Sequence, residues 1–472
     1  MSTLSELFFK GPIMRRSIAA LACCTATVAP LRGQAPLGGA VDSVVRQVLQ
    51  STGVPGASVA VVQDGRLVYA QGYGAAQLEP LVPARPEMRF SIGSISKQFA
   101  AAAILLLQQD GKLSLDDPVA RFLPDLTRAR DVTIRQLLSH TSGYQDYWPQ
   151  DYVPPFMLDS ISAAAILDRW AKKPLDFEPG TRWQYSNTNY VIAGLIAERV
   201  SGMPFFEFLR SRILAPLGMQ SVVNIDLGRL PQSDPTGYMR YALGPPRPAP
   251  KEGKGWLFAA GELAMTAADL AKWDIALMNR SLLSPASYQA LETETLLKSG
   301  TGTGYGLGVD VGMDGERRLI SHGGEVSGFT ASNLVYPDDH AAVIVLVNQD
   351  AVSAAGAIAR RIGGLLFATQ DANTDARATR ARGIFQGLQH GTIDRSLFTM
   401  DGNAYFSAQA VADFASSLGP LGAPQAFVQV AQQLRGGMIL RVYRVTFADR
   451  ALRVWTFELP DGMLEQYQVS AN

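Results

Sequence analysis

The sequence predicts an α/β (α+β) fold for the main part of the chain, followed by a small α+β domain. Segments with β-strand character occur at both ends of a first unit, and amphipathic helices with Pro/Gly loops lie between them. Residues 369–382 lack large apolar side chains, and a separate helix and strand pattern follows them. We therefore expect folded domains at 36–368 and 383–472, joined by a linker at 369–382.

Composition excludes several classes of protein. The chain has 472 residues, of which 47% are hydrophobic and 18% charged, so it can bury a large core and is not globally disordered. Its 42 basic residues equal its 42 acidic residues, and no basic block occurs, which argues against nucleic acid as a partner. The apolar run at 99–107 is shorter than the ~18 residues that a membrane span needs.

Residues 1–35 have the pattern of a secretory signal peptide. Met14 and two arginines precede a mostly apolar stretch, Ser17 to Leu31, and Gly33-Gln34-Ala35 is a small-x-small exit. We expect cleavage after Ala35 and export to the periplasm or the medium, with a frayed N-terminal segment as the alternative. Translation from Met14 fits this pattern better than translation from Met1. Leu21-Ala22-Cys23-Cys24 weakly resembles a lipoprotein acylation box, and both cysteines of the chain would be lost with the leader.

The elements of the first unit follow from local patterns. Two β-rich runs at 57–63 and 66–72 flank Asp64-Gly65, a dipeptide that favours tight hairpins. A helix is predicted from Ser94 to Asp110, ended by Gly111, and Thr266 to Asp269 opens another helix as a capping box. Later strands are predicted at 306–312, 317–322, 329–336 and 341–347, with a helix at 354–367.

The last 90 or so residues give a smaller pattern. Ser407 can cap a helix that runs to Leu418. Strands are predicted at 438–447, 452–459 and 463–469, separated by turn residues. This small α+β domain is distantly similar to NTF2-like folds.

Ser94-Ile95-Ser96-Lys97 is the first segment with potential for chemistry. Residues three apart share one face of a helix, so the Lys97 amine can reach the Ser94 hydroxyl. A serine becomes nucleophilic when a neighbouring base takes its proton, and a lysine must be desolvated to be neutral near pH 7. The apolar helix that follows makes such burial plausible. Alone, the Ser-x-x-Lys spacing is weak, because a surface helix pair gives the same match.

Two distant segments strengthen this interpretation. Tyr185-Ser186-Asn187 follows a turn-rich approach, and a tyrosine can relay protons when a cation nearby favours its phenolate. His322-Gly323-Gly324 ends a predicted strand, where glycines let a substrate approach the strand edge and use its N–H donors.

Together, Ser94-x-x-Lys97, Tyr185-x-Asn187 and His322-x-Gly324 resemble the three active-site motifs of the serine β-lactamase and penicillin-binding protein superfamily. The match is to its class C-like branch, which includes esterases and D-aminopeptidases. The resemblance spans about Val45 to Leu366, with similar flanks at Leu137–Gly143 and Tyr305–Gly308. It implies an antiparallel sheet flanked by helices, beside an all-helical subdomain, with the site in the cleft between them.

The resemblance also implies residue roles. Ser94 would be the acylated nucleophile and Lys97 its base, while Tyr185 would pass a proton to the leaving group and activate the deacylating water. Asn187 would hydrogen-bond the substrate. The N–H groups of Ser94 and of Glu325, which follows His322-Gly323-Gly324, would form the oxyanion hole.

One position departs from the family pattern. β-Lactamases usually carry lysine where this chain has His322, and histidine is mostly uncharged at neutral pH. Recognition of anionic β-lactams should therefore suffer, and esters or amino-terminal peptides become better candidates. Lys298-Ser299-Gly300 imitates the missing motif, but its glycine-rich context predicts a surface turn.

The predicted function is a serine hydrolase that cleaves small esters, amides or D-amino-acid peptides through an acyl-enzyme. The alternatives are a penicillin-binding or cell-wall peptide-binding protein that deacylates slowly, or a class C-like β-lactamase. No cofactor or metal is expected, because the four histidines are not clustered; His140 is expected to be structural, and His340 and His390 solvated. The aromatic loop Tyr144, Tyr147, Trp148 and Tyr152 fits either a core or a substrate pocket. The oligomeric state stays open.

Overall fold

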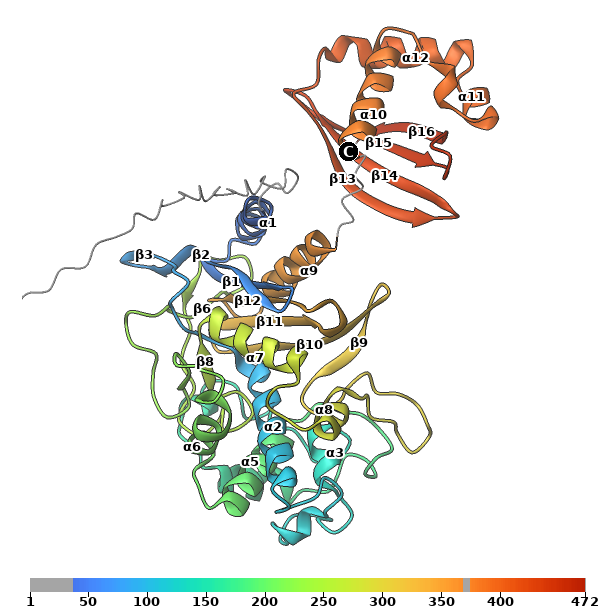
Figure 1. The fold of residues 1–472 in the computed structure, drawn as a ribbon. Coiled ribbons are helices and arrows are strands. Elements are labelled where there is room, and N and C mark those ends of the chain that lie inside the picture. The colour runs from blue at the N-terminus through green and yellow to red at the C-terminus, as the bar shows by residue number, and fades with distance from the viewer. Residues whose placement is uncertain (1–36, 368–373, 472) are drawn as a thin grey trace, which may run out of the picture.

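The computed structural model describes residues 37–367 and 374–471, and its largest feature is an antiparallel sheet of seven strands (Figure 1). The strand order is β3-β2-β1-β12-β11-β10-β9, so strands from the two ends of the first unit pair at β1 and β12. The predicted leader, residues 1–35, lies outside the described residues. The strands are β1 (Gly56–Gln63), β2 (Arg66–Leu78), β3 (Leu81–Pro83), β9 (Asp310–Asp314), β10 (Arg317–Val326), β11 (Phe329–Tyr336) and β12 (Ala341–Val347).

Helices cover both faces of this sheet. α1 (Leu37–Thr52) and α9 (Ala354–Leu366) share an apolar cluster with one face, and α2 (Ser96–Gln109) and α7 (Ala267–Asn279) belong to the cluster on the other. Figure 1 shows α9 and α7 on opposite sides of the strands. Every residue of β11 and β12 is buried, which explains why β12 is an apolar run without alternation, whereas β11 also buries the polar side chains of Thr330, Ser332 and Asn333.

The local predictions around the hairpin and the capped helix are confirmed. β1 and β2 pair through the turn at Asp64 and Gly65, whose φ angles of +51° and +69° are those of a tight hairpin. α7 begins after Thr266, whose side chain accepts a hydrogen bond from Asp269 N, but the reciprocal half of the predicted capping box is absent because Thr266 N donates to Ser221 Oγ. The helix predicted from Ser94 starts as the 3₁₀ turn η1 (Gly93–Ile95) and continues as α2.

A helical region extends between β4 and β8, on the side of the sheet that carries α2 (Figure 1). It holds α3 (Ile134–Leu138), α4 (Ala163–Ile166), α5 (Asn187–Ser201) and α6 (Phe205–Leu209), and α8 (Pro285–Glu292) follows α7. The remaining short strands are β4 (Phe90–Ser91), β5 (Val223–Asn224), β6 (Tyr238–Met239), β7 (Arg247–Pro248) and β8 (Leu263–Met265). α2 runs through the middle of the apolar core, and twelve of its side chains are buried. The serine and lysine of the first motif are therefore attached to a rigid element.

The strand predicted at 306–312 is wrong in its first half, because β9 begins only at Asp310. Gly306 N donates to Val309 O at 2.9 Å, which closes a turn. Gly308 has a φ of +77°, and a Cβ there would lie 2.7 Å from Lys97 O. The glycines thus let this segment turn against the helix that carries Lys97.

The chain ends in a small sheet domain with the strand order β13-β14-β15-β16. The strands are β13 (Ala426–Arg435), β14 (Met438–Thr446), β15 (Ala451–Glu458) and β16 (Leu464–Ala471), and the helices are α10 (Thr374–Gln389), α11 (Met400–Tyr405) and α12 (Ala408–Leu418). Ser407 caps α12 as predicted. β13 was not predicted, because its register shifts between Gln429 and Ala431 and disturbs the alternation.

The predicted linker is wrong over 374–382, which form the first half of α10. In the first half of this helix the small side chain of Ala381 is buried, and it joins the large side chains of Ile384, Phe385 and Leu388 from the second half in one apolar cluster. Arg380 also pairs with the buried carboxylate of Glu458. A criterion based on large apolar residues missed a helix that packs through alanine. No helix in the described ranges is long and apolar enough to cross a membrane.

Candidate active site

Ser94 lies on η1 and Lys97 in the first turn of α2, and the Lys97 Nζ–Ser94 Oγ distance is 2.9 Å. Ser94 is partly exposed, whereas Lys97 is fully buried. Gly93 before the serine has a φ of +52°, and a Cβ there would lie 2.6 Å from Glu325 N. Only glycine allows strand β10 to approach Ser94 this closely.

The Lys97 amine is surrounded by oxygen atoms. Besides Ser94 Oγ, it lies 2.8 Å from Asn187 Oδ1 and 2.7 Å from Ala260 O. Burial lowers the pKa of Lys97 to about 7, and the nearby carboxylate of Asp146 opposes this shift. A substantial fraction of Lys97 is therefore neutral near pH 7 and can accept the Ser94 proton.

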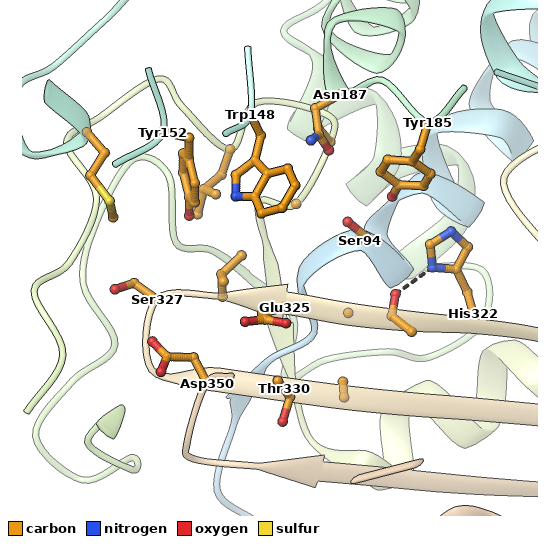
Figure 2. A pocket seen from close by; sticks show the side chains of 18 of the residues that line it. Ser94, Trp148, Tyr152, Tyr185, Asn187, His322, Glu325, Ser327, Thr330 and Asp350 are labelled. Carbon is orange, nitrogen blue, oxygen red and sulfur yellow. Dashed lines mark hydrogen bonds between the residues drawn. The ribbon is translucent and has the colours of Figure 1, made fainter. Parts of the chain in front are cut away.

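Tyr185 lies in the loop that leads into α5, and Asn187 is the first residue of that helix. Figure 2 shows Tyr185 facing Ser94 and His322 across the cleft, and Lys97 Nζ lies 5.0 Å from the centre of the tyrosine ring. Burial raises the pKa of Tyr185, and the Ser94 hydroxyl opposes this in part. The expected phenolate form is thus disfavoured, and a neutral phenol that can donate a proton remains.

The third motif lies on β10 beyond the end of β9, whose pairing stops at Ser321. From His322 onward this edge of β10 runs alongside the 3₁₀ turn η1 that carries Ser94. A Cβ on Gly324 would lie 1.9 Å from Ile92 O and 3.3 Å from Ser94 N. The N–H groups of Ser94 and Glu325 are therefore close neighbours, as an oxyanion hole requires.

His322 is held as a neutral imidazole. Its Nδ1 lies beside Gly323 O, which can only accept, so this nitrogen carries the proton. Its Nε2 then accepts from the Tyr305 hydroxyl at 2.9 Å. Burial lowers the pKa of His322 to about 4, partly opposed by the Gly323 carbonyl. No positive charge stands where the family usually places lysine.

Alanine substitutions at the two glycines of the third motif should affect stability differently. Gly324→Ala should lower the free energy of unfolding by about 1–3 kcal/mol, because the added carbon overlaps Ile92 O. It should also lower kcat/KM by pushing β10 away from Ser94. In Gly323→Ala the nearest atom would be Ala331 O at 3.8 Å, so stability should change by less than about 0.5 kcal/mol. Equal stability of the two variants, measured by thermal unfolding, would contradict this assignment.

A cleft of about 760 Å³ opens over these groups. Trp148 and Tyr152 of the aromatic loop line it (Figure 2), Tyr144 belongs to the core, and Tyr147 both lines the cleft and belongs to the core cluster. The aromatic loop therefore contributes both to the core and to the lining of the cleft. No described residue lining the cleft is lysine or arginine, while Glu325 and Asp350 are acidic.

Sequence reasoning placed some residues correctly and missed others. His140 is structural, as predicted: it is buried, its Nδ1 accepts from Ser186 N at 3.1 Å, and its ring stacks 4.2 Å from that of Tyr185. Lys298 lies in an exposed turn, also as predicted. Asp146 and Tyr305 contact the site residues Asn187 and His322 without having been predicted to do so. Asp146 stands within the aromatic loop, but no motif marks it.

Two known proteins are similar to this chain in sequence. Penicillin-binding protein 4* of Bacillus subtilis strain 168 is 28% identical over 322 residues, which are 62% of this chain and 68% of that protein. Protein flp of Staphylococcus aureus strain MW2 is 27% identical over 65% of this chain and 62% of its own length. The chain thus spans about two thirds of the length of these relatives.

Two solved structures are similar over large parts of the chain. D-amino acid amidase from Ochrobactrum anthropi SV3, complexed with L-phenylalanine amide, is 27% identical with a TM-score of 0.61, over 72% of this chain and 99% of that one. The octameric penicillin-binding protein homologue from Pyrococcus abyssi is 22% identical with a TM-score of 0.63, over 92% and 99%, and supports the fold alone. The family model "Beta-lactamase" matches residues 41–366. Because this match covers well over half of the chain, the chain belongs to the beta-lactamase family, within the serine β-lactamase and penicillin-binding protein superfamily.

Proposed function

We propose that this serine hydrolase cleaves amides or esters that carry an apolar group and no carboxylate, amides of D-amino acids among them. The observation that carries the proposal is the buried Lys97 amine 2.9 Å from Ser94 Oγ, at the floor of a cleft without lysine or arginine in its described lining. The D-amino acid amidase of Ochrobactrum anthropi supports the substrate class by its similarity.

Acylation follows from the placement of these groups. Lys97 Nζ takes the Ser94 proton while Oγ bonds to the substrate carbonyl carbon. The negative charge on the carbonyl oxygen is stabilised by the N–H groups of Ser94 and Glu325. The carbon–nitrogen or carbon–oxygen bond then breaks, and the leaving group departs with a proton from the neutral Tyr185 phenol, which regains one from Lys97. The acyl group remains as an ester on Ser94.

Deacylation uses the same groups in reverse. A water molecule loses a proton to the Lys97–Tyr185 pair and bonds to the acyl carbon. The Ser94 ester bond breaks, Oγ regains its proton, and the acyl group leaves as a carboxylic acid. The balanced reaction is hydrolysis of one amide or ester bond.

The charges around the cleft favour neutral or cationic substrates. Burial raises the pKa of Asp350, and the nearby charge of Glu325 raises it further, so these carboxylates lie close enough to interact. Figure 2 shows both on the same side of the cleft, along the strands from His322. A substrate with a free amine is attracted here, whereas the carboxylate of a β-lactam is repelled.

A substrate panel tests this proposal. The full chain is assayed with D-phenylalanine p-nitroanilide, its N-acetyl derivative, p-nitrophenyl butyrate and nitrocefin. We expect the highest kcat/KM among the amides for the free-amine substrate and the lowest value of all for nitrocefin. A preference for nitrocefin would contradict the proposed substrate class.

The variant Asp350→Asn tests whether the negative charge of Asp350, rather than the shape of its side chain, favours substrates with a free amine. The asparagine keeps an oxygen that can accept from Gly328 N, which Asp350 Oδ2 binds at 2.8 Å. We expect kcat/KM to fall about tenfold for the free-amine amide and to stay unchanged for p-nitrophenyl butyrate, which carries no charge. An equal fall for both substrates would show that the variant damages the cleft generally.

The penicillin-binding relatives support a second candidate, a protein that acylates but deacylates slowly. A neutral Tyr185 is a poor base for activating water, which is the observation that favours it. Intact-mass spectrometry after mixing with substrate distinguishes the two. A persistent adduct on Ser94 indicates slow deacylation, and free enzyme with released product indicates turnover.

A further inference from the structure

Asp146 lies in the aromatic loop and binds the second motif through its side chain. Asp146 Oδ1 accepts hydrogen bonds from Asn187 N at 3.0 Å and Trp148 N at 3.2 Å. The Asn187 side-chain nitrogen Nδ2 lies 3.3 Å from Oδ1 and 3.2 Å from Oδ2 of the same carboxylate. Both carboxylate oxygens therefore receive N–H groups from one neighbour.

These contacts determine which way the Asn187 amide points. A side-chain amide has one accepting end, Oδ1, and one donating end, Nδ2. An ionised carboxylate can only accept, so it holds the donating end of Asn187. The accepting end must then face Lys97, and Asn187 Oδ1 lies 2.8 Å from Lys97 Nζ.

The orientation of Asn187 in turn directs the lone pair of Lys97. A neutral lysine amine has two N–H groups and one lone pair. Ala260 O and Asn187 Oδ1 can only accept, so they take the two N–H groups, at 2.7 and 2.8 Å. Ser94 Oγ, at 2.9 Å, is the one remaining partner and can donate its hydroxyl proton. The lone pair therefore points at the proton that it must remove.

We propose that Asp146 is a positioning residue that keeps the lone pair of Lys97 directed at Ser94, by holding the Asn187 amide with its oxygen toward Lys97. The inference rests on the proposed function, because it concerns how Ser94 is activated. If the amide turned over, Asn187 Nδ2 would donate to the lone pair and compete with the serine.

Asp146 also acts on Lys97 through its charge. Three titratable groups respond to this carboxylate: Lys97 on α2, Tyr185 before α5, and Tyr147 in the same loop. Lys97 is the cationic one of the three. Burial raises the pKa of Asp146 to about 6, while its hydrogen bonds and Lys97 oppose this. Removing the carboxylate removes a stabilising influence on protonated Lys97, which shifts its deprotonation to lower pH.

Two variants distinguish positioning from packing. In Asp146→Asn, the new side-chain oxygen can keep the N–H groups of Asn187 and Trp148, which puts its NH₂ against Asn187 Nδ2. Two donors then face each other at the position of Asp146 Oδ2, which drives the Asn187 amide to turn although its Nδ2 also lies 3.3 Å from Oδ1. In Asp146→Ala the amide loses its partner but is not forced to turn. Positioning therefore predicts more damage from the isosteric variant than from the truncation, whereas packing alone predicts the opposite.

The experiment measures kcat, KM and the pH dependence of kcat/KM for both variants in the full chain, with exposed Asp159→Asn as the control for removing a charge. We expect kcat to fall at least about tenfold in Asp146→Asn and less in Asp146→Ala, with KM nearly constant. The acid limb should move to lower pH in both variants, while the control matches wild type. Melting temperatures show that each variant is folded.

Several results would overturn the inference: Asp146→Asn within threefold of wild type, Asp146→Ala more impaired than Asp146→Asn, or an unmoved acid limb. These differ from failure of the proposed function. If the wild-type chain hydrolyses nothing, or if Ser94→Ala is as active as wild type, the hydrolase proposal itself fails. If Ser94→Ala is inactive and Asp146→Asn is not impaired, only the role of Asp146 is lost.

Discussion

Ser94→Ala should abolish both turnover and covalent labelling, with kcat falling by about 10⁴-fold or more. The hydroxyl is the only nucleophile that the geometry provides next to the Lys97 amine among the described residues, at 2.9 Å. Without it no acyl ester can form, while the cleft and the oxyanion N–H groups remain. Hydrolysis of p-nitrophenyl butyrate and intact mass after a serine-directed phosphonate measure the two effects.

The segment Lys298-Ser299-Gly300, which imitates the family's third motif, supplies the matched control. Ser299 lies in the exposed turn with Lys298 and Gly300. Ser299→Ala should therefore retain wild-type rates and full labelling. Labelled Ser94→Ala protein, or loss of labelling in Ser299→Ala, would place the nucleophile elsewhere.

Lys97→Arg should be nearly as severe, with kcat/KM falling by about 10³-fold. A guanidinium has a pKa above about 12 and stays protonated, so it cannot accept the Ser94 proton. It is also larger than the buried amine, which leaves it no room among Ser94, Asn187 and Ala260 O. Lys298→Arg in the exposed turn is the control and should match wild type.

The same lysine sets the pH dependence of the wild-type chain. Burial lowers the pKa of Lys97 to about 7, and only its neutral form can take the serine proton. The kcat/KM should therefore rise about tenfold per pH unit below pH 7 and level off above it. His322, whose pKa is lowered to about 4, should not contribute to this limb. A rate that falls as pH increases from 6 to 8 would contradict the assigned base.

Local sequence predicted the parts of the site that lie close together in the chain. The spacing of Ser94 and Lys97 predicts their contact on one helical turn, and the apolar helix after them predicts the burial that shifts the lysine pKa. The glycines at 323 and 324 predict a close approach, which the crowding of Gly324 against Ile92 bears out. The spacing and the apolar helix are local properties, whereas the partner of Gly324, Ile92, comes from a distant segment of the chain.

Other parts could not be predicted from local patterns. The helix over 374–382 packs through alanines and an ion pair with Glu458, about 80 residues later in the chain. Asp146 acquires its proposed role from Asn187, which begins α5 about 40 residues later in the chain. The signal peptide at 1–35 and export stay predictions, because they fall outside the described residues.

For this protein, the order of residues along the chain determined its family, its proposed nucleophile and base, and the absence of lysine from the third motif. Tertiary structure decided the protonation states and the directions of hydrogen bonds, which set how the site works. Both depend on burial and on partners from distant segments: Asp146, Tyr305 and Ala260 contact Asn187, His322 and Lys97 only after the sheet and the helical region close around the cleft. A linear sequence carries the donors and acceptors, and folding determines which of them meet.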